Sequence, residues 1–571
     1  MKRIVLYISL VFLLAGCSDL LDIKPTNMIS EEDVKNDPVL VDAFLTKIYN
    51  SIRWQTGAPT ANQAMLNVVG GEQNVFAGWQ QPFIVAMAIM DEGGANSWLD
   101  YWPYANIRSA NEIILMLEEA SFDEAVIQQK IAEARFLRAF EYFELVKRYG
   151  GIPLITVPQS IDSPKEQLMV KRNSEQEIYD FIAKEVDEIV AFLPAELDAS
   201  KFGRATKWVA LALKSRAMTY AGSIGEYGQV QLDGLLGISK GEKDDYWQAA
   251  YDASIELINE GPHALYNETA DKVKNFEEVF IKDGNSEVIF AEVYSSELNK
   301  LHGWNHYCMP DGFKIGWGSN NTVYIETVEK WGYIDGRNGK LDWSELDGNT
   351  LFDIEALMHQ KDPRFRASVF YPESSWQDRK VYFHSSTIGT VDGGDDWPKA
   401  APTRNRIKTG FLVKKRVNEM IEYPVSTTDE TDWIVFRLGE TYLNAAEAAF
   451  HLGNTDEATR LINVVRDRAG MPDVEILTME DIQNERTAEL AFEEHRYWDI
   501  RRWRMAVEEL NGKGLHGIDW KYNYAEKKYT MKLKDGDFGA VRTFTERNYY
   551  FPLGIGRIAD NPNLVENPGY N

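Results

Sequence analysis

The amino-acid sequence predicts a mainly α-helical protein in which four tetratricopeptide-like helix pairs support a loop-rich lobe with small β elements. Three observations lead to this fold class. Residues 437–469 form a tight helical hairpin pattern, earlier stretches repeat the helical period in pairs, and residues 263–432 show no helical period over most of their length. A tetratricopeptide-like hairpin needs neighbours to bury its second apolar face, so one such pair predicts others.

The hairpin at 437–469 is the clearest helical unit of the chain. Apolar residues from Leu438 to Ala449 recur at the spacing that lines one face of a helix. Thr455 is expected to cap the second helix after a tight turn. The second apolar face and the turn fit the tetratricopeptide pattern at Gly453, Ala458, Ile462 and Val465.

Three further pairs are expected earlier in the chain. The first combines a helix near 39–52 with one near 107–117, and the second combines 124–149 with 174–189. The third combines 206–220 with 244–257. Long loops separate the pairs, so we expect a helical repeat scaffold at about 38–262 and 433–508.

The ligand-facing variable lobe is expected mainly at 54–97 and 263–432. These stretches are rich in Gly, Asn and Trp, and long irregular segments of compact proteins often carry function. Strand-like pieces predict small sheets at EVIFAEVY, RKVYFH, KYTMKL and RNYYFPL. No low-complexity linker divides the chain, so residues 17–571 are expected to form one composite unit.

The N-terminus has the pattern of a bacterial lipoprotein. Two basic residues precede an apolar run from Ile4 to Leu14, which leads through Leu-Ala-Gly to Cys17. This pattern predicts a signal peptide at 1–16 and a lipid on Cys17, while the run is too short to span a membrane. Only Cys308 would then remain, which excludes an intrachain disulfide and a cysteine-based zinc site.

The overall charge restricts the class of partner. The chain carries 88 acidic and 61 basic residues, a formal charge of −27. Nucleic-acid binding needs a cationic surface, so we expect no nucleic-acid partner. The excess of acidic residues is explained simply by solubility, because a high net charge keeps a protein soluble.

Motifs of known enzymes are absent or incomplete. The chain lacks His-Glu-x-x-His, Gly-x-Ser-x-Gly and the P-loop, and Gly554–Ala559 imitates a dinucleotide motif without the βαβ unit that such a motif needs. Carboxylate pairs of the glycosidase kind stay open, because so many acids supply candidates. We therefore expect no enzyme and no cofactor.

Two stretches are weak candidates for a metal site. The acidic turn Asp392–Asp396 lacks full calcium-loop spacing, and a solvated turn explains it better. His302 and His306 are four residues apart in a stretch that does not promise a helix. We expect no metal at either place. The pair Glu493-Glu494 is interpreted as a structural ion-pair partner of the nearby Arg486 and Arg496.

Aromatic residues among amides and acids in loops point to carbohydrate binding. A sugar ring can stack its apolar face on an indole, while amides and charged groups bind its hydroxyls. For any single loop tryptophan, packing in the core is an equally good explanation, so the set carries the argument. The candidate glycan-binding residues are Trp79, Asn96, Trp98, Trp304 and Trp317.

Several long motifs, in order along the chain, resemble the SusD/RagB family of surface lipoproteins. They are CSDLLDIKP after the lipobox, AEARFLRAFEYFELVKRYGGIPL, RLGETYLNAAEAAFHLGNTDEATRLINVVRDRAG, ERTAELAFEEHRYWDIRRW and the ending NPNLVENPGY. The resemblance covers nearly the whole chain. It implies four tetratricopeptide-like helix pairs that hold a variable ligand lobe.

The resemblance also implies a function. Family members are nutrient-binding lipoproteins on the outer face of the outer membrane. They deliver oligosaccharides to a SusC-like TonB-dependent transporter, and they are not enzymes. Their binding aromatics lie in loops that align poorly, so the five candidates above are placed only by region and composition.

Three alternatives to glycan delivery stay open at this point. The first is peptide or glycoprotein binding on the same scaffold, for which the site should be less aromatic. A surface hydrolase and an assembly adaptor that binds no small ligand are the others. The glycan, its linkage, the involvement of calcium and the stoichiometry with the transporter do not follow from the sequence.

Overall fold

The structure is a computed structural model, and it describes most of the chain between residues 34 and 570. The candidates Trp79, Asn96, Trp98 and Trp317, the lipidation site Cys17 and the acidic turn at 392–396 lie outside the described residues. The described ranges are 34–54, 65–78, 80–87, 90–91, 94–95, 99–198, 201–310, 318–382, 384, 386–388, 407–421, 424–425 and 427–570.

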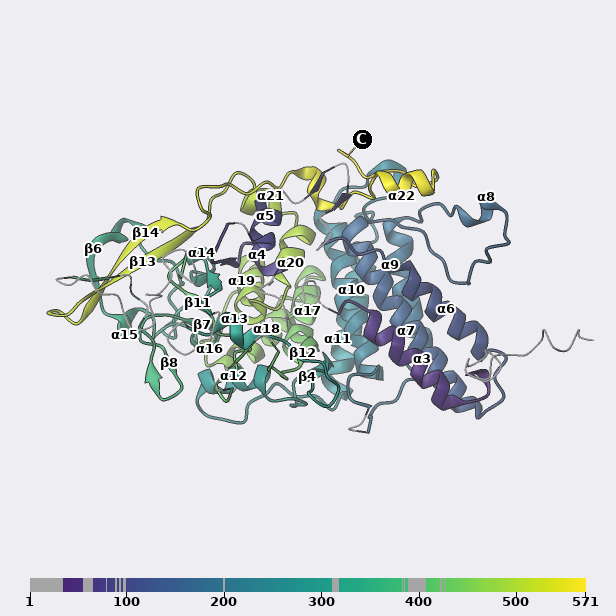
Figure 1. The fold of residues 1–571 in the computed structure, drawn as a ribbon, viewed down its shortest axis with the longest axis horizontal. Helices are drawn as coiled ribbons and strands as arrows, with labels where there is room; N and C mark the ends of the chain where they lie inside the picture. Colours follow the sequence, from purple (N-terminus) through teal and green to yellow (C-terminus); the bar gives the residue numbers. More distant parts are fainter. Residues whose placement is uncertain are drawn as a thin grey trace, which may run out of the picture.

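Eight long helices form the four expected pairs. Figure 1 shows them on the right and in the centre of the molecule, with the loop-rich lobe on the left. Their bounds lie close to the predicted ones. The pairs are α3 (Pro38–Ser51) with α6 (Tyr104–Leu117), α7 (Glu124–Tyr149) with α9 (Glu175–Ile189), α10 (Lys207–Tyr227) with α11 (Lys243–Glu260), and α17 (Leu438–His451) with α18 (Thr455–Ala469).

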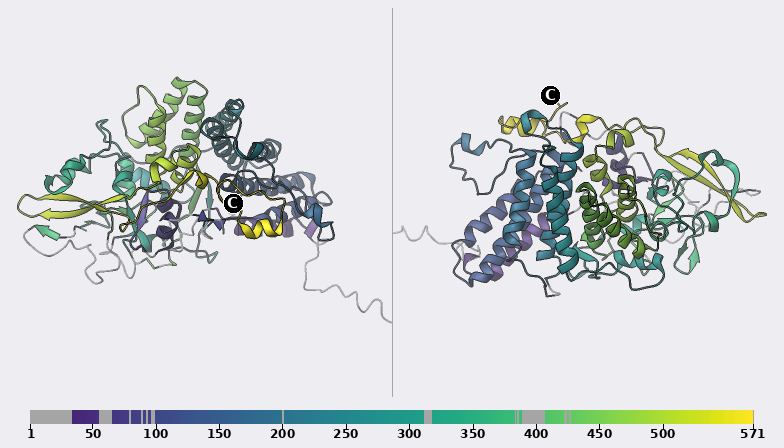
Figure 2. Two further views of the ribbon diagram at one scale, coloured as in Figure 1. Left: turned by 90° about the horizontal axis from the view of Figure 1, so that it is seen from above. Right: turned by 180° about the vertical axis from the view of Figure 1, so that it is seen from behind.

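Successive pairs pack on one another through their apolar faces. α6 packs on α7, α9 on α10 and α11 on α17, so the pairs follow an arc across the molecule (Figure 2). Polar caps fix where the helices begin: Ser174 and Glu177 form a reciprocal capping box on α9. The cap of α18 is Asn454, one residue before the expected Thr455, because its side chain accepts from the backbone N–H of Glu457.

The other helices are shorter and connect the scaffold to the lobe. α19 (Met479–Leu490) follows the fourth pair and packs on α17. The rest are α4 (Met65–Val69), α5 (Gln81–Met87), α8 (Lys165–Leu168), α12 (Lys272–Ile281), α13 (Trp304–Cys308), α14 (Ile325–Val328), α15 (Ile354–Leu357), α16 (Pro363–Ser368), α20 (Arg496–Arg502), α21 (Ala506–Leu510) and α22 (Ile555–Asp560).

Small sheets organise the lobe. One has the strand order β1-β5-β11-β7 and another has the order β10-β13-β14-β6. Two-stranded pairs are β4 with β12, β2 with β3, and β8 with β9. The strands are β1 (Gln73–Val75), β2 (Met90–Asp91), β3 (Gly94–Ala95), β4 (Val288–Glu292), β5 (Asn321–Val323), β6 (Asp347–Phe352), β7 (Val369–Phe370), β8 (Ser375–Trp376), β9 (Arg379–Lys380), β10 (Ser386–Ile388), β11 (Leu412–Val413), β12 (Trp433–Arg437), β13 (His516–Asn523) and β14 (Lys528–Asp535).

The strand predictions have a mixed outcome. EVIFAEVY contains β4 and KYTMKL lies in β14. RNYYFPL is not a strand: residues Glu546–Tyr549 form a 3₁₀ turn whose Thr545 and Asn548 side chains cap it reciprocally. Its alternating aromatics are buried on the helical scaffold instead, where Phe551 packs against Trp498.

The lobe leaves the scaffold and returns to it at one place. β4 runs antiparallel to β12, with Val288 opposite Arg437 and Glu292 opposite Trp433. β4 precedes most of the lobe and β12 leads directly into α17, so the two strands that bound residues 293–432 lie side by side.

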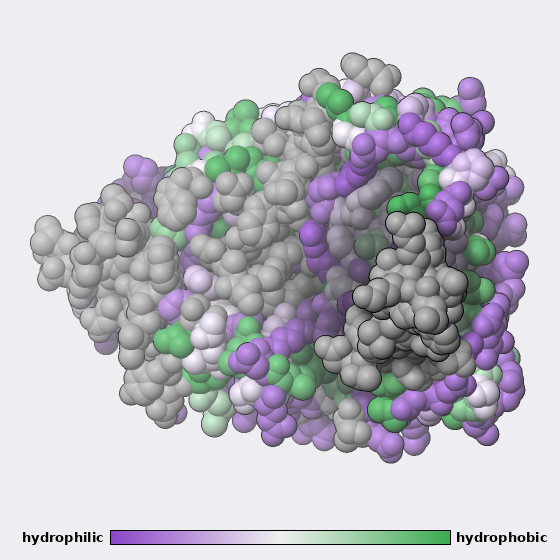
Figure 3. All heavy atoms as spheres, turned by 45° about the vertical axis from the view of Figure 1, so that its right-hand side comes forward, coloured by the Kyte–Doolittle hydropathy of each residue, from purple (hydrophilic) through white to green (hydrophobic). Residues whose placement is uncertain are grey.

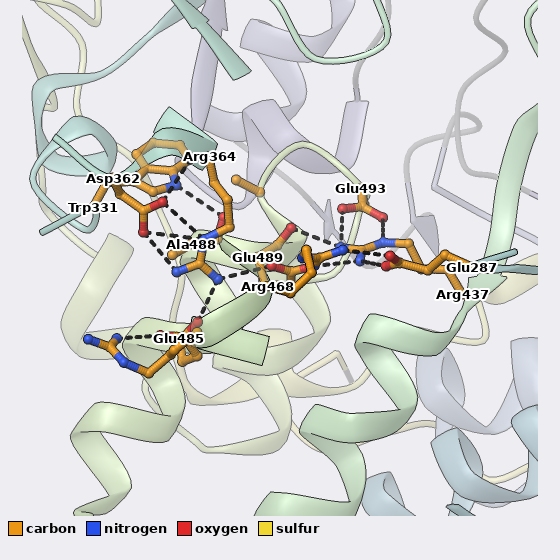
Figure 4. A network of polar contacts seen from close by, with 12 residues as sticks. Glu287, Trp331, Asp362, Arg364, Arg437, Arg468, Glu485, Ala488, Glu489 and Glu493 are labelled. Atoms are coloured by element: carbon orange, nitrogen blue, oxygen red, sulfur yellow. Dashed lines mark hydrogen bonds and ion pairs between the residues drawn. The ribbon is translucent and has the colours of Figure 1, made fainter. Parts of the chain in front are cut away.

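Buried ion pairs join this ribbon, the scaffold and the lobe (Figure 4). Arg437 binds Glu287 and Glu489 at 2.7 Å each, and it also binds Glu493 at 2.7 Å. Arg468 of α18 binds Glu287 at 2.5 Å and also pairs with Glu489. The lobe contributes Arg364 of α16, which lies 2.9 Å from Glu489, and Lys415, which lies 2.6 Å from Glu493.

The charges of this cluster balance. Three guanidiniums (Arg364, Arg437 and Arg468) meet five carboxylates, and Lys415 and Arg466 at the edge bring the positive charges to five as well. Removing these charged side chains from water costs free energy, and a buried cluster is tolerated when every charge in it has a partner of opposite sign. The carboxylates are Glu287, Asp362, Glu485, Glu489 and Glu493.

The pairing predicted for Glu493 was wrong in its partners. Arg437 and Lys415 bind Glu493, while Arg486 lies against Asp499 and Arg496 binds Glu509 at 2.7 Å. The reason is that α19 ends at Leu490, so Glu493 does not share a helix with either arginine. The structural role expected for these charges is nevertheless present.

The outer surface of the scaffold is mostly hydrophilic with scattered hydrophobic residues (Figure 3). None of the described helices is long and apolar enough to cross a membrane.

Candidate functional site

Two loop stretches that are about 250 residues apart in the chain meet in one sheet. β1 pairs antiparallel with β5, so that Gln73 lies opposite Val323 and Val75 lies opposite Asn321. β1 leads towards Trp79, and β5 follows Trp317 in the chain. The two regions from which most of the candidate glycan-binding residues were chosen are therefore joined by backbone hydrogen bonds.

Buried amides extend this junction. Gln80 Nε2 donates to Asn320 Oδ1 at 3.1 Å, Asn320 Nδ2 donates to Asn321 Oδ1 at 3.0 Å, and Asn321 Nδ2 contacts Cys308 Sγ at 3.0 Å. On the other strand, Asn74 Nδ2 donates to the Gly536 carbonyl at 2.7 Å. Amides can both donate and accept, which suits a site for hydroxyl groups.

Several polar atoms at this junction are buried without a partner. Among the described residues, neither side-chain atom of Gln73 has a hydrogen bond, and the same holds for Gln80 Oε1 and Ser319 Oγ. An unsatisfied buried polar group costs about 1–3 kcal/mol, and native structures keep few of them. Their concentration beside β1 and β5 marks this junction as a candidate binding site.

Asp537 ties the junction to the C-terminal part of the chain. Its carboxylate is fully buried and accepts from Tyr324 Oη at 2.5 Å and from the Leu515 N–H at 2.8 Å. Asn74 and Arg542 lie 3.4 Å from it, and Arg542 donates onward to the Val68 carbonyl at 2.7 Å. One carboxylate thus holds the segments on both sides of the sheet.

Phe538 is an aromatic residue of this region that loop composition did not predict. Its backbone has a φ of 55°, which is strained for a bulky residue, and its side chain is 36% exposed. It packs edge-to-face on Phe83 of α5 with a centroid distance of 5.0 Å, and Lys408 Nζ lies 4.4 Å from the ring centroid. The turn sequence Asp-Gly-Asp-Phe-Gly at 535–539 was the available signal.

Trp304 must be removed from the candidate set. It begins the short helix α13, its side chain is only 2% exposed, and Nε1 donates to the Lys415 carbonyl at 2.9 Å. Its ring packs edge-to-face on Trp433. A side chain buried in this way has no face for a ligand, and composition alone did not distinguish it from a loop tryptophan.

The histidines near Trp304 serve structure. His302 Nε2 lies 2.8 Å from the Thr431 carbonyl, and His306 Nδ1 lies 3.0 Å from the Pro424 carbonyl. Within the part of the chain that the structure describes, no group of three or more His, Cys, Asp or Glu side chains is arranged to hold a metal.

Glu72 lies between β1 and the scaffold. It is buried, its Oε1 accepts from the Phe492 N–H at 3.3 Å, and its Oε2 has no partner among the described residues. Burial raises the pKa of Glu72 to about 7, and Arg496 and Lys415 oppose this only in part. The carboxyl group therefore titrates near neutral pH in the folded protein.

Replacing Glu72 with glutamine should stabilise the protein at high pH. The folded pKa lies above the value of about 4.3 for an unfolded chain, so the stability that this group contributes is complete below about pH 4 and is lost as the pH rises through about 7. Glutamine keeps an acceptor and carries no charge. We expect a gain on the order of 2 kcal/mol at pH 8 and almost none at pH 4.

The measurement is urea unfolding of both proteins at pH 4, 6 and 8. Glu480→Gln, an exposed acid on α19, is the control and should change nothing with pH. A Glu72→Gln variant that loses stability at pH 8 but not at pH 4 would show that the folded protein needs the charged carboxylate.

Comparison with known proteins identifies the family. The SusD family model matches residues 286–570, and a model described as starch-binding, associating with the outer membrane, matches residues 19–218. The chain belongs to the SusD family. A model of the prokaryotic membrane lipoprotein lipid attachment site matches residues 1–18, which include Cys17, so this SusD family member is a lipid-anchored protein of the outer membrane.

Related SusD proteins are distant in sequence but similar over most of their length. A SusD-like protein of Bacteroides ovatus is 24% identical over 518 residues, covering 88% of this chain and 82% of that protein. The starch-binding protein SusD of Bacteroides thetaiotaomicron is 24% identical over 484 residues, covering 79% and 74%.

Solved structures of the SusD family share the fold. A SusD-like protein from Bacteroides fragilis aligns with a TM-score of 0.75 at 23% identity, covering 96% of this chain and 100% of that one. A laminarin-binding SusD-like protein aligns with a TM-score of 0.62 at 20% identity, covering 94% and 100%.

Proposed function

We propose that this protein captures oligosaccharides or polysaccharides at the cell surface and passes them to a SusC-like TonB-dependent transporter, without cleaving them. The observation that carries the proposal is the junction of β1 and β5. It brings two stretches rich in tryptophan and amides into one sheet, and buried polar atoms of Gln73, Gln80 and Ser319 there have no partner among the described residues.

The chemistry of the junction suits a sugar. Trp79, Asn96, Trp98 and Trp317 belong to the stretches that lead into or out of this sheet, and indole faces stack on the apolar faces of sugar rings. The exposed ring of Phe538 adds an aromatic surface from the C-terminal part. The names of two relatives, one starch-binding and one laminarin-binding, support a glycan as the ligand class.

The lipid anchor and the helical scaffold support the proposed delivery to a SusC-like transporter. A lipid on Cys17 would hold the protein at the membrane, and Figure 3 shows a face of the scaffold on which hydrophilic residues predominate. Such a surface suits docking to a membrane transporter, while the lobe handles the ligand.

The double variant Trp98→Ala, Trp317→Ala should bind glycan at least tenfold more weakly while it stays folded. Each buried aromatic contact with a ring contributes about 1 kcal/mol or more, so two account for such a loss. Affinity electrophoresis in gels that contain starch or laminarin, together with a glycan array, measures it.

Tyr524→Ala, which removes an exposed aromatic side chain at the tip of the β13–β14 hairpin, is the control for this site. Unchanged retention of a glycan that the wild type binds would remove Trp98 and Trp317 from the site. A wild type that binds peptides in a pull-down and no glycan on the array would contradict the proposal itself.

A further inference from the structure

A large cleft lies between the scaffold and the lobe, next to the turn that precedes β1. It encloses about 860 Å³ between α19 and α21 on one side and residues 326–340 on the other. The turn at Gly70 and Gly71, directly before β1, lines it too. Ligand sites usually enclose about 300–1,000 Å³, so the cleft has the size of a site for several sugar rings.

Most charges along the cleft already have partners in the protein. Glu326 binds His516 at 2.7 Å, and Arg496 binds Glu509 at 2.7 Å. Arg466 binds Glu485 at 2.7 Å. These pairs build the walls and leave the remaining polar groups for a ligand.

Two partly buried side chains in the cleft are uncommitted. Lys330, which follows α14, and Asn484 of α19 both line it, and the side chain of neither has a hydrogen bond or ion pair among the described residues. Burial lowers the pKa of Lys330, and the nearby Arg496 lowers it further. A hydroxyl oxygen in the cleft would give this amine the acceptor that the protein does not supply.

Free donors and acceptors both line the cleft. Among the described residues, three lysines and three acids there have neither an ion pair nor a side-chain hydrogen bond. Two further acids without an ion pair, Glu329 and Asp481, accept hydrogen bonds from Trp343 and Thr478, so the lining does not favour an anion. A neutral ligand with many hydroxyls both donates and accepts, and it can use groups of both kinds. The six free groups are Lys330, Lys340, Lys513, Asp473, Glu480 and Glu508.

An oriented aromatic ring stands at the edge of the cleft. Trp343 Nε1 donates to Glu329 Oε1 at 2.7 Å, and the indole contacts the His516 ring at a centroid distance of 5.1 Å. Glu329 and His516 both line the cleft. The indole is 37% exposed, so a fixed ring surface is available beside the uncommitted polar groups.

We propose that this cleft is a second saccharide site, which binds a neutral oligosaccharide segment with Trp343 stacked on a ring and with Lys330 and Asn484 bonded to hydroxyls. The inference rests on the proposed function. The Gly70–Gly71 turn continues directly through Glu72 into β1, so the cleft and the β1–β5 junction share one short backbone segment. A long chain can engage both, which raises its apparent affinity without new contacts at either.

The test compares four proteins on an array of neutral and uronic-acid-containing oligosaccharides that includes maltohexaose and laminarihexaose. They are the wild type, the cleft variant Lys330→Gln with Asn484→Ala, the edge variant Trp343→Ala, and a control, Lys240→Gln with Tyr524→Ala. The control changes an exposed lysine of the scaffold and a tyrosine that is 62% exposed at the tip of the β13–β14 hairpin.

We expect the cleft and edge variants to bind neutral hexasaccharides about tenfold more weakly, at an unchanged thermal midpoint, while the control matches the wild type. In the Trp98→Ala, Trp317→Ala background, the same changes should abolish the residual binding. Because Trp343 is exposed at the edge, its variant tests the site even if the cleft variant folds poorly.

Three outcomes would overturn the inference while the proposed function stands. They are neutral-glycan affinities within twofold of the wild type, a loss confined to the uronic-acid-containing glycans, and a loss of transporter binding with glycan binding intact. A wild type that binds none of the glycans contradicts the proposed function, and the cleft proposal falls with it.

Discussion

Replacing Glu489 with glutamine is expected to lower the free energy of unfolding by about 3–5 kcal/mol, because it leaves buried guanidiniums with one carboxylate too few. Glu489 is fully buried and binds Arg437, Arg468 and Arg364 at once. Glutamine has nearly the same shape, so the change tests charge and not packing. The surplus positive charge has no water to solvate it.

Acid should reproduce this loss. Burial acts to raise the pKa of Glu489, but Arg468, Arg437 and Arg364 outweigh it and hold the pKa well below its ordinary value. A carboxyl group with a depressed folded pKa contributes stability above its unfolded pKa of about 4.3, and this stability is lost as the pH falls through the folded pKa. The Glu489→Gln variant should therefore lose less stability than the wild type between pH 5 and pH 2.

Urea unfolding followed by tryptophan fluorescence measures both effects. Arg460→Gln is the control, because Arg460 forms an exposed pair with Glu457 within α18 and its loss should cost less than about 1 kcal/mol. Gly439→Ala tests the same cluster by a second change: a Cβ there would lie 2.3 Å from Arg437 Nη1, so it should displace the guanidinium and destabilise the protein. A Glu489→Gln variant as stable as the wild type would show that the cluster does not hold the lobe to the scaffold.

Replacing Asp537 with alanine is expected to impair stability and glycan binding together. The change removes the acceptor of Tyr324 Oη and of the Leu515 N–H, and it leaves Arg542 buried without its carboxylate. Truncating one partner of a buried charge pair costs about 3–5 kcal/mol. Because Asn74 of β1 and Tyr324 after β5 both contact Asp537, the junction should lose its fixed geometry.

Starch and laminarin affinity gels and thermal unfolding test this prediction. We expect at least a tenfold loss of retention at a temperature where the variant is still folded. Asp519→Ala, on β13 of the same region, removes a side chain that has no hydrogen-bond or ion-pair partner among the described residues, so it should behave like the wild type. Normal retention by a folded Asp537→Ala variant would mean that the junction does not position the ligand-binding residues.

The helical frame could be predicted from the sequence because its signals are local. The capping box at Ser174 and Glu177 and the apolar spacing from Ala458 to Val465 act within one or two helical turns. The strands of the lobe were harder, since β1 and β5 each span only three residues and pair over a long separation in the chain. Such a pairing leaves no periodic signal.

Only part of the candidate site could be predicted, because its residues also come together from distant parts of the chain. Composition led to the stretches around β1 and β5, but it could not separate Trp304, which the core of the lobe buries, from a tryptophan that meets a ligand. Asp537 and Phe538 were missed because they enter the region from the C-terminal part, more than 200 residues away from β5. Both lie in the turn Asp-Gly-Asp-Phe-Gly at 535–539, and a turn signal does not tell which distant strands the turn contacts.

The side-by-side strands β4 and β12 allow this fold to diversify. Residues 293–432 begin and end at this ribbon, so their length and content can change while the helix pairs keep their positions. Doubling a loop costs only about 0.6 kcal/mol in closure entropy. Gene duplication followed by exchange of this segment can therefore produce paralogues with new nutrient preferences on one inherited frame, as long as the new segment still supplies the cations that Arg364 and Lys415 provide.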